Sequence, residues 1–556
     1  MQFRNLLTLK GLLGALALLS VVSAQAQTSN ALSGQVSSAE EGLMEGVLVN
    51  AKKDGSNKTT TVVSNDKGQF SFPADRIEPG KYTITIRAAG YDLVGPKTVD
   101  VAAGAGAKMD VKLAKPRGIP QLTNAEWLIS VPGDEKFKLA WMSDCINCHT
   151  LQRVFTSPHT PDEWEGVFKR MGLYAPMTVP ARPQMIVSGG NRSERMRVPE
   201  PLIKQAAQYL VDVSVHNPDR SYEYKYLPRP KGRATKVIVT EWDLPRKEAL
   251  VHDVVLDPVG NAWYCDFGAQ IVGELNPKTG EVKDYQLPIY RPEQPKGSLD
   301  LEIDPDGNMW VGMSYQAGAA KINTKTKEIT PYPLNKEWVG VTSQTNHITP
   351  THMHVDGKVW MKDSETRNHY RLDIHSGKWE NVGPPVDAAG KGINGYGIPS
   401  DKFNNVYMLE YGNTRIGRHD KNTLVAKAWA TPSPRSRPRR GRFDDEGLLW
   451  FGEYGANAIG MFDPATEKIK EWLMPTPWSQ PYDAAPTKGG VEVWTGSMLT
   501  DQVARLNTKT DTIVEYLLPR STNVRRVFVD DTSGPRPVLW VGSNHGASII
   551  KVEPLD

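Results

Sequence analysis

From Lys236 to the end of the chain one sequence unit recurs, and this repeat constrains the fold more than any other feature. Each unit has an apolar approach, a turn of the Asp-Pro-x-Gly-Asn type, an aromatic residue on a short strand, and a later Asn/Asp-x-x-Thr-Gly turn. The aromatic residues that open the units lie 43 to 50 residues apart: Trp263, Trp310, Trp360, Tyr407, Trp450, Trp494 and Trp540. A period in the forties with several strands per unit is typical of a β-propeller. The repeat therefore predicts a seven-bladed β-propeller over residues 236–556.

The two ends of this region predict how the ring closes. The last unit stops near residue 554, before the outer strand with which other units finish. The segment 237–245 precedes the first unit, yet it matches outer strands such as 284–288 and 515–519. We expect it to complete the last blade, because an open strand edge is a liability.

The N-terminus has the pattern of a secretory signal peptide. Arg4 and Lys10 precede and flank an apolar run from Leu12 to Val22, and small residues follow at 24–26. Residues 1–26 are therefore predicted to be a cleaved signal peptide, which places the protein in the periplasm. No later stretch approaches the roughly 20 apolar residues that a membrane span needs. The formal net charge of +3 with interspersed signs does not suggest a nucleic-acid partner.

Residues 31–115 show short alternating runs, such as 81–87, separated by turn residues. This pattern predicts a small β-sandwich. The run Asp-x-Gly-x-Phe-x-Phe at 66–72, Gly-x-Tyr at 80–82 and Gly-Tyr at 90–91 resemble the carboxypeptidase regulatory-like domain. The resemblance implies an accessory module.

The segment Cys145-Ile-Asn-Cys148-His149 has the spacing of c-type haem attachment. Two thiols at this spacing reach both vinyl groups of one porphyrin edge, and His149 then lies under the iron as proximal ligand. The sequence thus predicts haem c, bound through Cys145 and Cys148. A redox CxxC pair and half of a zinc site are the alternatives.

The flanking residues predict helices. Thr160-Pro-Asp-Glu163 is a good helix start, after which Trp164 begins an apolar face, and a second helix is expected near 201–213. The arrangement resembles the mono-haem cytochrome c domains of periplasmic dehydrogenases, which implies a small cytochrome c domain at 121–216 and a linker at 217–235. By that resemblance Met171 is favoured as the sixth iron ligand. The other candidates are Met177, Met185, Met196 and His159.

The predicted fold class is therefore mainly β. It comprises an N-terminal β-sandwich, a small α-helical cytochrome c domain and a C-terminal seven-bladed β-propeller.

Equal offsets in the repeat predict which residues line the channel. Three residues after each aromatic stand Asp266, Met313, Asp363, Glu410, Glu453, Ser497 and Ser543. At the strand starts stand His252, Leu299, Thr351, Tyr396, Arg439, Tyr482 and Arg525. Fixed positive groups with histidine and tyrosine suit an anionic or phenolic small molecule. The alternative for the acids is that they only accept hydrogen bonds from backbone amides.

The units at 252–263 and 449–460 resemble the virginiamycin B (streptogramin B) lyase family over all seven blades. The resemblance implies elimination with a divalent metal, a strand-start histidine and an acid after the blade aromatic. It carries over to His252, Glu410 and Glu453 as catalytic candidates. The last blade departs from the family, because it has Arg525 and Ser-Asn-His at 543–545.

Two further side-chain groups have open interpretations. His352 and His354 are expected on one strand face, where they could bind a metal with His347 or His252, and plain hydrogen bonding is the alternative. Cys265 is expected to be a buried, inert thiol.

Three functions remain open. The first is an oxidoreductase in which the propeller binds a small organic substrate and the cytochrome domain passes electrons to a periplasmic acceptor. The second is a metal-dependent C–O lyase with an auxiliary cytochrome. The third is a non-catalytic electron-transfer or binding module.

Overall fold

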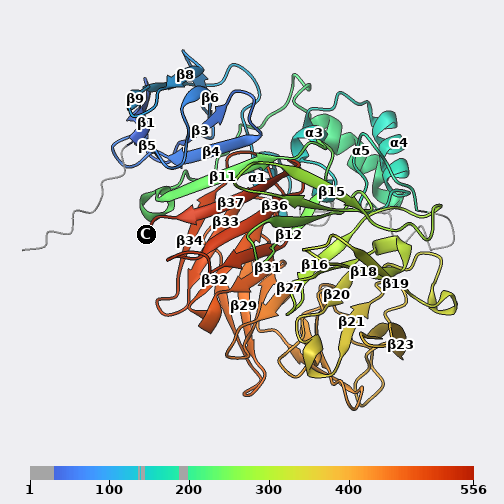
Figure 1. Ribbon diagram of the computed structural model, residues 1–556. Helices are drawn as coiled ribbons and strands as arrows, with labels where there is room; N and C mark the ends of the chain where they lie inside the picture. The colour runs from blue at the N-terminus through green and yellow to red at the C-terminus, as the bar shows by residue number, and fades with distance from the viewer. Residues whose placement is uncertain (1–29, 136–137, 139–144, 187–197, 199) are drawn as a thin grey trace, which may run out of the picture.

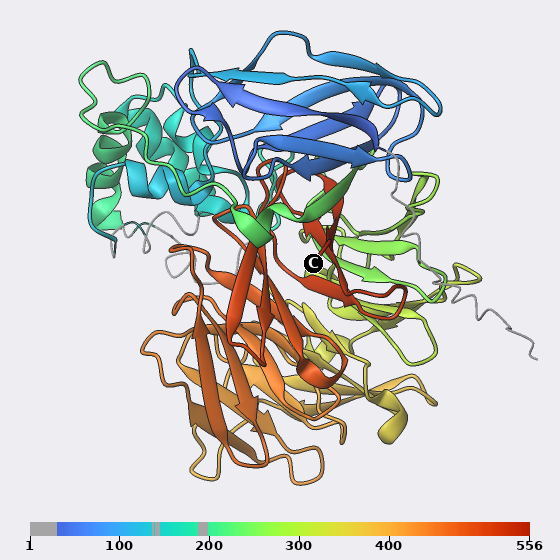
Figure 2. The same ribbon diagram turned by 90° about the vertical axis from the view of Figure 1, so that its left-hand side faces the viewer.

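The computed structural model describes residues 30–135, 138, 145–186, 198 and 200–556. The predicted signal peptide and Met196 lie outside the described residues. The described chain forms a β-sandwich, a helical segment and a propeller. The sandwich and the helices lie on the same side of the propeller (Figures 1 and 2).

The sandwich has two layers. One sheet contains β1 (Asn30–Ser38), β2 (Gly42–Leu43), β5 (Gln69–Pro73), β7 (Asp92–Val94), β9 (Ala107–Lys108) and β10 (Val111–Ala114). The other layer contains β3 (Leu48–Lys53), β4 (Lys58–Val63), β6 (Gly80–Arg87) and β8 (Thr98–Val101). Phe70, Phe72 and Ile84 are buried between the layers, because alternate residues of each strand point inward.

The second layer of the sandwich continues into the propeller as one sheet. Strand β11 (Val237–Asp243) pairs antiparallel with β37 (Ser548–Pro554) on one side and with β4 on the other. The first pairing confirms that the segment before the first repeat completes the last blade. The second pairing was not predicted, and it covers the outer edge of that blade with the sandwich.

Residues 236–556, all of which the structure describes, form seven blades. Blades 1 to 3 contain β12 (Val251–Leu256), β13 (Ala262–Asp266), β14 (Ile271–Leu275), β15 (Val282–Gln286), β16 (Leu299–Ile303), β17 (Met309–Gly312), β18 (Gly318–Ile322), β19 (Ile329–Pro333), β20 (His347–Thr349), β21 (Lys358–Lys362), β22 (His369–Asp373) and β23 (Lys378–Gly383). Blades 4 and 5 contain β24 (Val406–Leu409), β25 (Arg415–His419), β26 (Ala426–Ala430), β27 (Pro438–Phe443), β28 (Leu449–Glu453), β29 (Ala458–Asp463) and β30 (Lys468–Leu473). Blades 6 and 7 contain β31 (Pro481–Pro486), β32 (Glu492–Ser497), β33 (Gln502–Asn507), β34 (Thr512–Leu517), β35 (Val527–Asp530), β36 (Val538–Ser543), β37 and β11.

In blades 1, 2 and 5 one aspartate binds both the turn and the aromatic residue of the repeat. In blade 1, Asp257 Oδ1 accepts from the backbone N–H groups of Val259 and Asn261, which closes the turn. Its Oδ2 accepts from Trp263 Nε1 at 3.0 Å. The same indole bond joins Trp310 to Asp304 and Trp450 to Asp444. The turn aspartate satisfies the buried indole N–H, so the turn residue and the blade aromatic are coupled in these three blades.

The segment between sandwich and propeller contains four α-helices within the described residues: α1 (Asn124–Ser130), α3 (Leu151–Phe155), α4 (Pro161–Met171) and α5 (Ile203–Asp212). Short 3₁₀ turns η1 (Cys145–Asn147), η3 (Glu200–Leu202) and η4 (Gly232–Thr235) accompany them. Helix α4 starts as its sequence predicts, with a capping box between Thr160 and Glu163.

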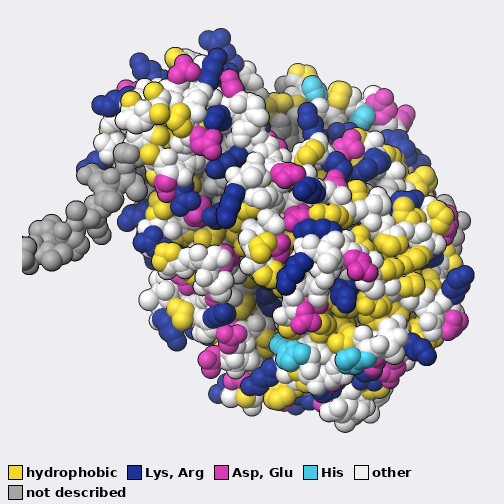
Figure 3. Space-filling view, in the orientation of Figure 1, with side chains coloured by type: hydrophobic (Ala, Val, Ile, Leu, Met, Phe, Trp, Pro, Cys, Tyr) yellow, Lys and Arg dark blue, Asp and Glu magenta, His cyan; other side chains and the backbone are white. Residues whose placement is uncertain are grey.

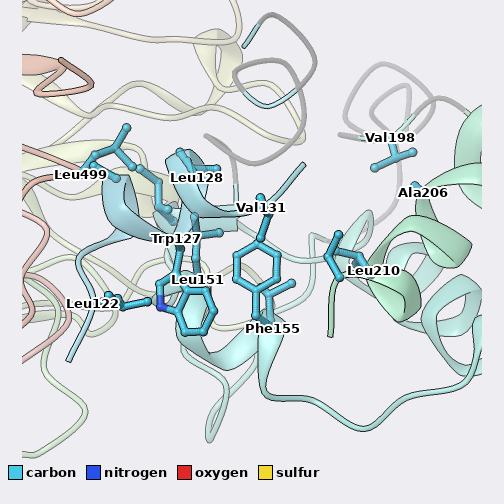
Figure 4. Packing of buried hydrophobic residues seen from close by; sticks show 14 of the residues in the cluster. Leu122, Trp127, Leu128, Val131, Leu151, Phe155, Val198, Ala206, Leu210 and Leu499 are labelled. Atoms are coloured by element: carbon cyan, nitrogen blue, oxygen red, sulfur yellow. The ribbon is translucent and has the colours of Figure 1, made fainter. Parts of the chain in front are cut away.

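The structure corrects the predicted fold class at this segment. The main β content, with a sandwich and a propeller, is confirmed, but no distinct α-helical cytochrome c domain is evident. The described helices share their core with the propeller, because Trp127, Leu151 and Phe155 belong to one hydrophobic cluster with Tyr482 and Leu499. Figure 4 shows Trp127, Leu151, Phe155 and Leu499 of this cluster. A backbone bond from Ala125 N to Leu499 O, 2.9 Å, joins α1 to blade 6. The helices are a cover on the propeller.

The surface carries both signs of charge. Lys and Arg side chains are interspersed with Asp and Glu over the face in Figure 3. Within the described part of the chain, no helix is long and apolar enough to cross a membrane.

Candidate functional site

The first strands of the blades surround the propeller axis. Strands β12, β16 and β20 contact one another in sequence, β27, β31 and β35 do the same, and β35 contacts β12. In blade 4 the segment at 397–400 takes this place and bridges to β24. Side chains from these segments therefore meet around one channel.

Seven residues form what we call the upper ring: His252, Leu299, His347, Tyr396, Arg439, Tyr482 and Arg525. The contacts of His252, His347, Tyr396, Arg439 and Tyr482 show that these five share one level. Tyr482 Oη lies 2.9 Å from His252 Nε2 and 2.7 Å from Tyr396 Oη. The rings of His347 and Tyr396 are 4.9 Å apart. His347 takes the position at which the sequence comparison placed Thr351, because β20 ends at Thr349 and residue 351 lies in the following turn.

Arg439 lies among tyrosines. Its guanidinium carbon is 4.2 Å from the ring centre of Tyr482, 4.5 Å from that of Tyr411, 4.8 Å from that of Tyr454 and 5.0 Å from that of Tyr396. Arg439 is only 7% exposed. Its Nη1 donates to Met498 Sδ at 3.4 Å, and its Nε has no hydrogen-bond partner among the described residues.

Arg525 is the second cation of the upper ring and is also buried. Its Nε donates to Asn523 Oδ1 and its Nη2 to the backbone oxygen of Asn147, each at 2.9 Å. Burial lowers the pKa of Arg525, the nearby tyrosines oppose this, and the charge of Arg439 adds to it. In the described part of the chain, neither Arg439 nor Arg525 has a carboxylate within ion-pair distance.

One residue further along the strands the arginines have carboxylate partners. The lower ring contains Asp253, Asp300, Arg440, Asp483 and Arg526. Arg440 pairs with Asp300 at 2.6 Å, and Arg526 pairs with Asp300 and, at 3.3 Å, with Asp483. The lower ring thus pairs both of its arginines with carboxylates, whereas the upper ring carries two cations without anions among the described residues.

His252 is fully buried and is held at both ring nitrogens. Nδ1 lies 2.9 Å from Asp253 Oδ1, and Nε2 faces Tyr482. Burial lowers the pKa of His252 to about 4, with Asp253 opposing the shift and Arg525 and Arg440 adding to it. The imidazole is therefore neutral at pH 7.

The two predicted catalytic acids lie away from His252. Glu410 accepts from the backbone N–H of Asn394 at 2.7 Å and forms an ion pair with Arg415. Glu453 is buried at the end of β28, beside Glu471 of the outer strand. No hydrogen bond or ion pair between described residues joins His252, Glu410 and Glu453. Glu410 and Glu453 lie at or just after the ends of second strands, whereas first strands line the channel.

The predicted haem-attachment residues lie together in the helical segment. Cys145, Cys148, His149 and Met171 line a cavity of about 230 Å³. His149 Nδ1 lies 3.1 Å from Thr150 O, and Cys148 Sγ lies 3.6 Å from Pro176 O. Of the alternative sixth ligands, His159 also lines the cavity. Met177 is buried beside the propeller, and Met185 is exposed.

The cofactor prediction is corrected. Within the described residues, no group of three or more His, Cys, Asp or Glu side chains could hold a metal ion. The described residues therefore support neither haem c nor a divalent metal in the propeller. In the propeller, Glu410 forms an ion pair with Arg415, which leaves its carboxylate unsuited to bind a metal. His354 lies in the 3₁₀ turn η7 (Met353–Val355) that follows His352, and not on a strand face.

Three residues of the site were not singled out from the sequence. Tyr411 and Tyr454 are adjacent to Glu410 and Glu453, and their place against Arg439 depends on which way the chain turns after each strand. Met498 likewise follows Ser497. The Glu-Tyr pairs at 410–411 and 453–454 were the available signal in the sequence. Nothing in the repeat shows that the two tyrosines face the same arginine.

Comparison with known proteins identifies a family for the N-terminal domain and several structures to which the chain is similar. Residues 31–114 match the carboxypeptidase regulatory-like domain family, which confirms the predicted N-terminal domain. The chain is similar in structure to virginiamycin B lyase from Staphylococcus aureus, with 22% identity, a TM-score of 0.48, and coverage of 57% of this chain and 100% of that chain. A streptogramin B lyase matches with 21% identity, a TM-score of 0.49, and coverage of 58% and 100%.

A third similar structure is an extracellular domain of a protein described as a hybrid two-component system from B. thetaiotaomicron. It has 17% identity, a TM-score of 0.43, and coverage of 56% of this chain and 42% of that chain. A comparison with curated proteins finds no relative that matches the sequence.

Proposed function

We propose that the upper ring binds a small aromatic organic anion beneath the helices that cover this end of the channel. The observation that carries the proposal is the pair of buried cations, Arg439 and Arg525, without a carboxylate partner among the described residues. In the lower ring, one residue further along the strands, each arginine has a carboxylate partner. The two rings thus differ in whether their arginines have negatively charged partners, and a bound anion would supply such a partner to the upper ring.

The energies of buried charges favour anion binding at the upper ring. Burying an unpaired charge costs several kcal/mol per ion, even after the surroundings relax. A cation–π contact returns roughly 0.5–2 kcal/mol, so the tyrosines around Arg439 offset part of this cost. Arg525 has one aromatic contact, with its guanidinium carbon 5.3 Å from the ring centre of Phe267. A bound carboxylate would compensate both arginines, and Arg forms short, charge-assisted bonds with carboxylates.

The tyrosines indicate the rest of the ligand. Tyr396, Tyr411, Tyr454 and Tyr482 present aromatic faces and hydroxyl groups around the same point. Tyr396 and Tyr411 are half-buried, which leaves this side of the ring open to solvent. A flat ring that carries a carboxylate suits these walls, because aromatic pairs gain energy beyond their buried area.

The cellular setting belongs to the same proposal. The pattern of residues 1–26 supports export to the periplasm. The oxidoreductase with a periplasmic electron acceptor, the lyase and the non-catalytic module stay predictions, and each of them is compatible with an anion held at the upper ring.

The test is calorimetric titration of the full chain with benzoate, benzamide and benzylamine. These probes share a ring and differ in charge, so we expect only benzoate to bind. Arg439→Met should weaken benzoate binding at least tenfold, and Arg439→Lys less. Arg371→Met is the matched control, because Arg371 also lies over an aromatic ring, Trp360, but is paired with Glu380 outside the channel. Equal binding of benzoate and benzamide would refute the proposal, as would unchanged binding in Arg439→Met with native circular dichroism.

A further inference from the structure

Four side chains from three blades form one continuous hydrogen-bonded chain. Asp253 and His252 come from β12, Tyr482 from β31, and Tyr396 from the segment before β24. The successive contacts are Asp253 Oδ1 to His252 Nδ1, 2.9 Å, His252 Nε2 to Tyr482 Oη, 2.9 Å, and Tyr482 Oη to Tyr396 Oη, 2.7 Å. The chain is buried at Asp253 and half-buried at Tyr396, so only its Tyr396 end is open toward solvent.

The direction of each bond follows from Asp253. Its Oδ2 accepts from the backbone N–H groups of Asp300 at 2.8 Å and Leu301 at 3.1 Å, and from the thiol of Cys265. Burial alone would raise the pKa of Asp253, but His252 and the surrounding arginines hold it well below its usual range. An ionised Asp253 can only accept, so His252 donates from Nδ1 and its Nε2 accepts from Tyr482. Tyr482 then accepts from Tyr396.

We infer that this chain is a proton relay, in which Tyr396 removes a proton from a C–H group next to a carbonyl of the anion bound at the upper ring. The inference rests on the proposed function. The substrate class is a small organic acid that carries such a carbonyl beside its acidic C–H bond. Tyr396 is the catalytic residue, and Tyr482, His252 and Asp253 act through it as positioning residues.

The step balances without an oxidant or a reductant. The proton leaves the substrate carbon for Tyr396 Oη, the hydroxyl proton of Tyr396 moves to Tyr482, and that of Tyr482 moves to His252 Nε2. The electron pair of the broken C–H bond stays on the substrate as an enolate. The resulting imidazolium faces Asp253, while Arg439 and Arg525 face the substrate anion. Return of the proton reverses each transfer.

The charges around the chain favour this transfer once an anion is bound. Arg439 and Arg440 lie 5.0 and 5.1 Å from the ring centre of Tyr396. Burial would raise the pKa of Tyr396, yet these two arginines hold it below its usual value. Arg525 contributes to the low pKa of His252. A carboxylate that neutralises Arg525 therefore raises the pKa of His252 and makes it a better proton acceptor in the complex than in the free protein.

The test is hydrogen–deuterium exchange at C3 of phenylpyruvate, followed by proton NMR in D₂O with the full chain. We expect exchange above the protein-free rate. General acid–base catalysis contributes about 10²–10⁴-fold, so Tyr396→Phe, Tyr482→Phe and His252→Gln should each reduce the catalysed exchange about 100-fold or more. Their dissociation constants for phenylpyruvate, measured by calorimetry, should change less than tenfold. Tyr332→Phe is the control, because Tyr332 stacks on Trp310 in blade 2 and lies outside the channel.

The outcomes separate the two proposals. If phenylpyruvate binds but exchanges at the protein-free rate, the relay is wrong and anion binding stands. If the relay variants bind it and exchange as fast as the unchanged protein, the relay is also wrong. If phenylpyruvate and benzoate both fail to bind, the proposed function and the relay fall together. The two Tyr→Phe variants keep the packing of the ring and break the chain at different points, so a folding defect in one leaves the other informative.

Discussion

The guanidinium of Arg87 and the carboxylate of Asp501 lie 2.6 Å apart in an ion pair that is almost fully buried between the sandwich and blade 6. Arg87 also donates to the backbone oxygen of Leu518 at 2.9 Å, and Asp501 accepts from the backbone N–H of Thr522 at 2.8 Å. Together with the β4–β11 pairing, these bonds fix the sandwich on the propeller.

Arg87→Met should destabilise the protein by about 3–5 kcal/mol, because it leaves the carboxylate of Asp501 buried without a partner. Thermal unfolding measures this as a lower midpoint temperature. Lys53→Met is the control, since the Lys53–Glu78 pair of the same sandwich is largely exposed and its loss should change the midpoint little. Adding Asp501→Asn to Arg87→Met should restore part of the loss. A double variant as unstable as the single one would show that the uncompensated charge is not the cause.

Gly460 on β29 should not tolerate a side chain. A Cβ atom there would lie 2.3 Å from Cε2 of Phe451, the residue that follows the blade aromatic on β28. Gly460→Ala therefore forces the Phe451 ring to move, and overpacking of this kind costs about 1–3 kcal/mol. Gly412→Ala serves as the control, because no atom lies within 4 Å of its Cβ position. Equal unfolding midpoints for the two variants would mean that Phe451 moves freely.

The repeat predicted the propeller because residues close together in the sequence form the same local structure in successive units. The aspartate of the turn binds the indole of its own blade, so the local pattern and the local structure coincide at Asp257 and Trp263. The closing strand β11 was predictable for the same reason, since an unpaired outer edge needs a partner. The packing partners of the helices could not be predicted from the helical sequences alone, because some of them come from the propeller. Trp127 and Phe155 look like the core of a separate domain until Tyr482 and Leu499 are seen against them.

The site was predicted in part for a similar reason. Equal offsets located His252, Tyr396, Arg439, Tyr482 and Arg525, because first strands of equal register project to one level. His347 was missed at that level because β20 is short and residue 351 lies in a turn. Glu410 and Glu453 also share an offset from their blade aromatics. However, each lies at or just after the end of the second strand of its blade, so the equal offset does not place them in the channel. The position of a residue in the repeat determines its depth along the channel axis. The order of its strand within the blade determines its distance from that axis.

Cys265 should be unreactive in the folded protein. Its side chain is fully buried, and its Sγ donates to Asp253 Oδ2 at 3.0 Å. Burial, together with the negative charge of Asp253, raises the pKa of Cys265. Because the thiolate is the reactive form, iodoacetamide at pH 8 should leave Cys265 unmodified in the native state and modify it in denaturant. Peptide mass spectrometry distinguishes this residue from the other two. Native modification at the denatured rate would contradict the burial of the Asp253 end of the relay.

Glu453 should make stability fall as pH rises. Burial, with the neighbouring Glu471 adding to it, raises the pKa of Glu453 to about 9 from an ordinary value of 4.5. Between these pH values the folded state keeps a proton that the unfolded chain has released. Each pH unit in that window therefore costs the folded state up to about 1.4 kcal/mol. The contribution is absent below pH 4.5 and complete above pH 9.

Glu453→Gln removes this titration while keeping the shape of the side chain. We expect the variant and the unchanged protein to unfold alike at pH 5, and the variant to be more stable by roughly 2–4 kcal/mol at pH 8. Denaturant titrations across pH 5 to 9 measure the difference. Glu410→Gln is the matched comparison at the same position of blade 4, and it should have the opposite sign, because it removes the carboxylate that pairs with Arg415. A constant difference between Glu453→Gln and the unchanged protein across this range would show that Glu453 is ionised in the folded state, and that its carboxylate has found a partner within blade 5.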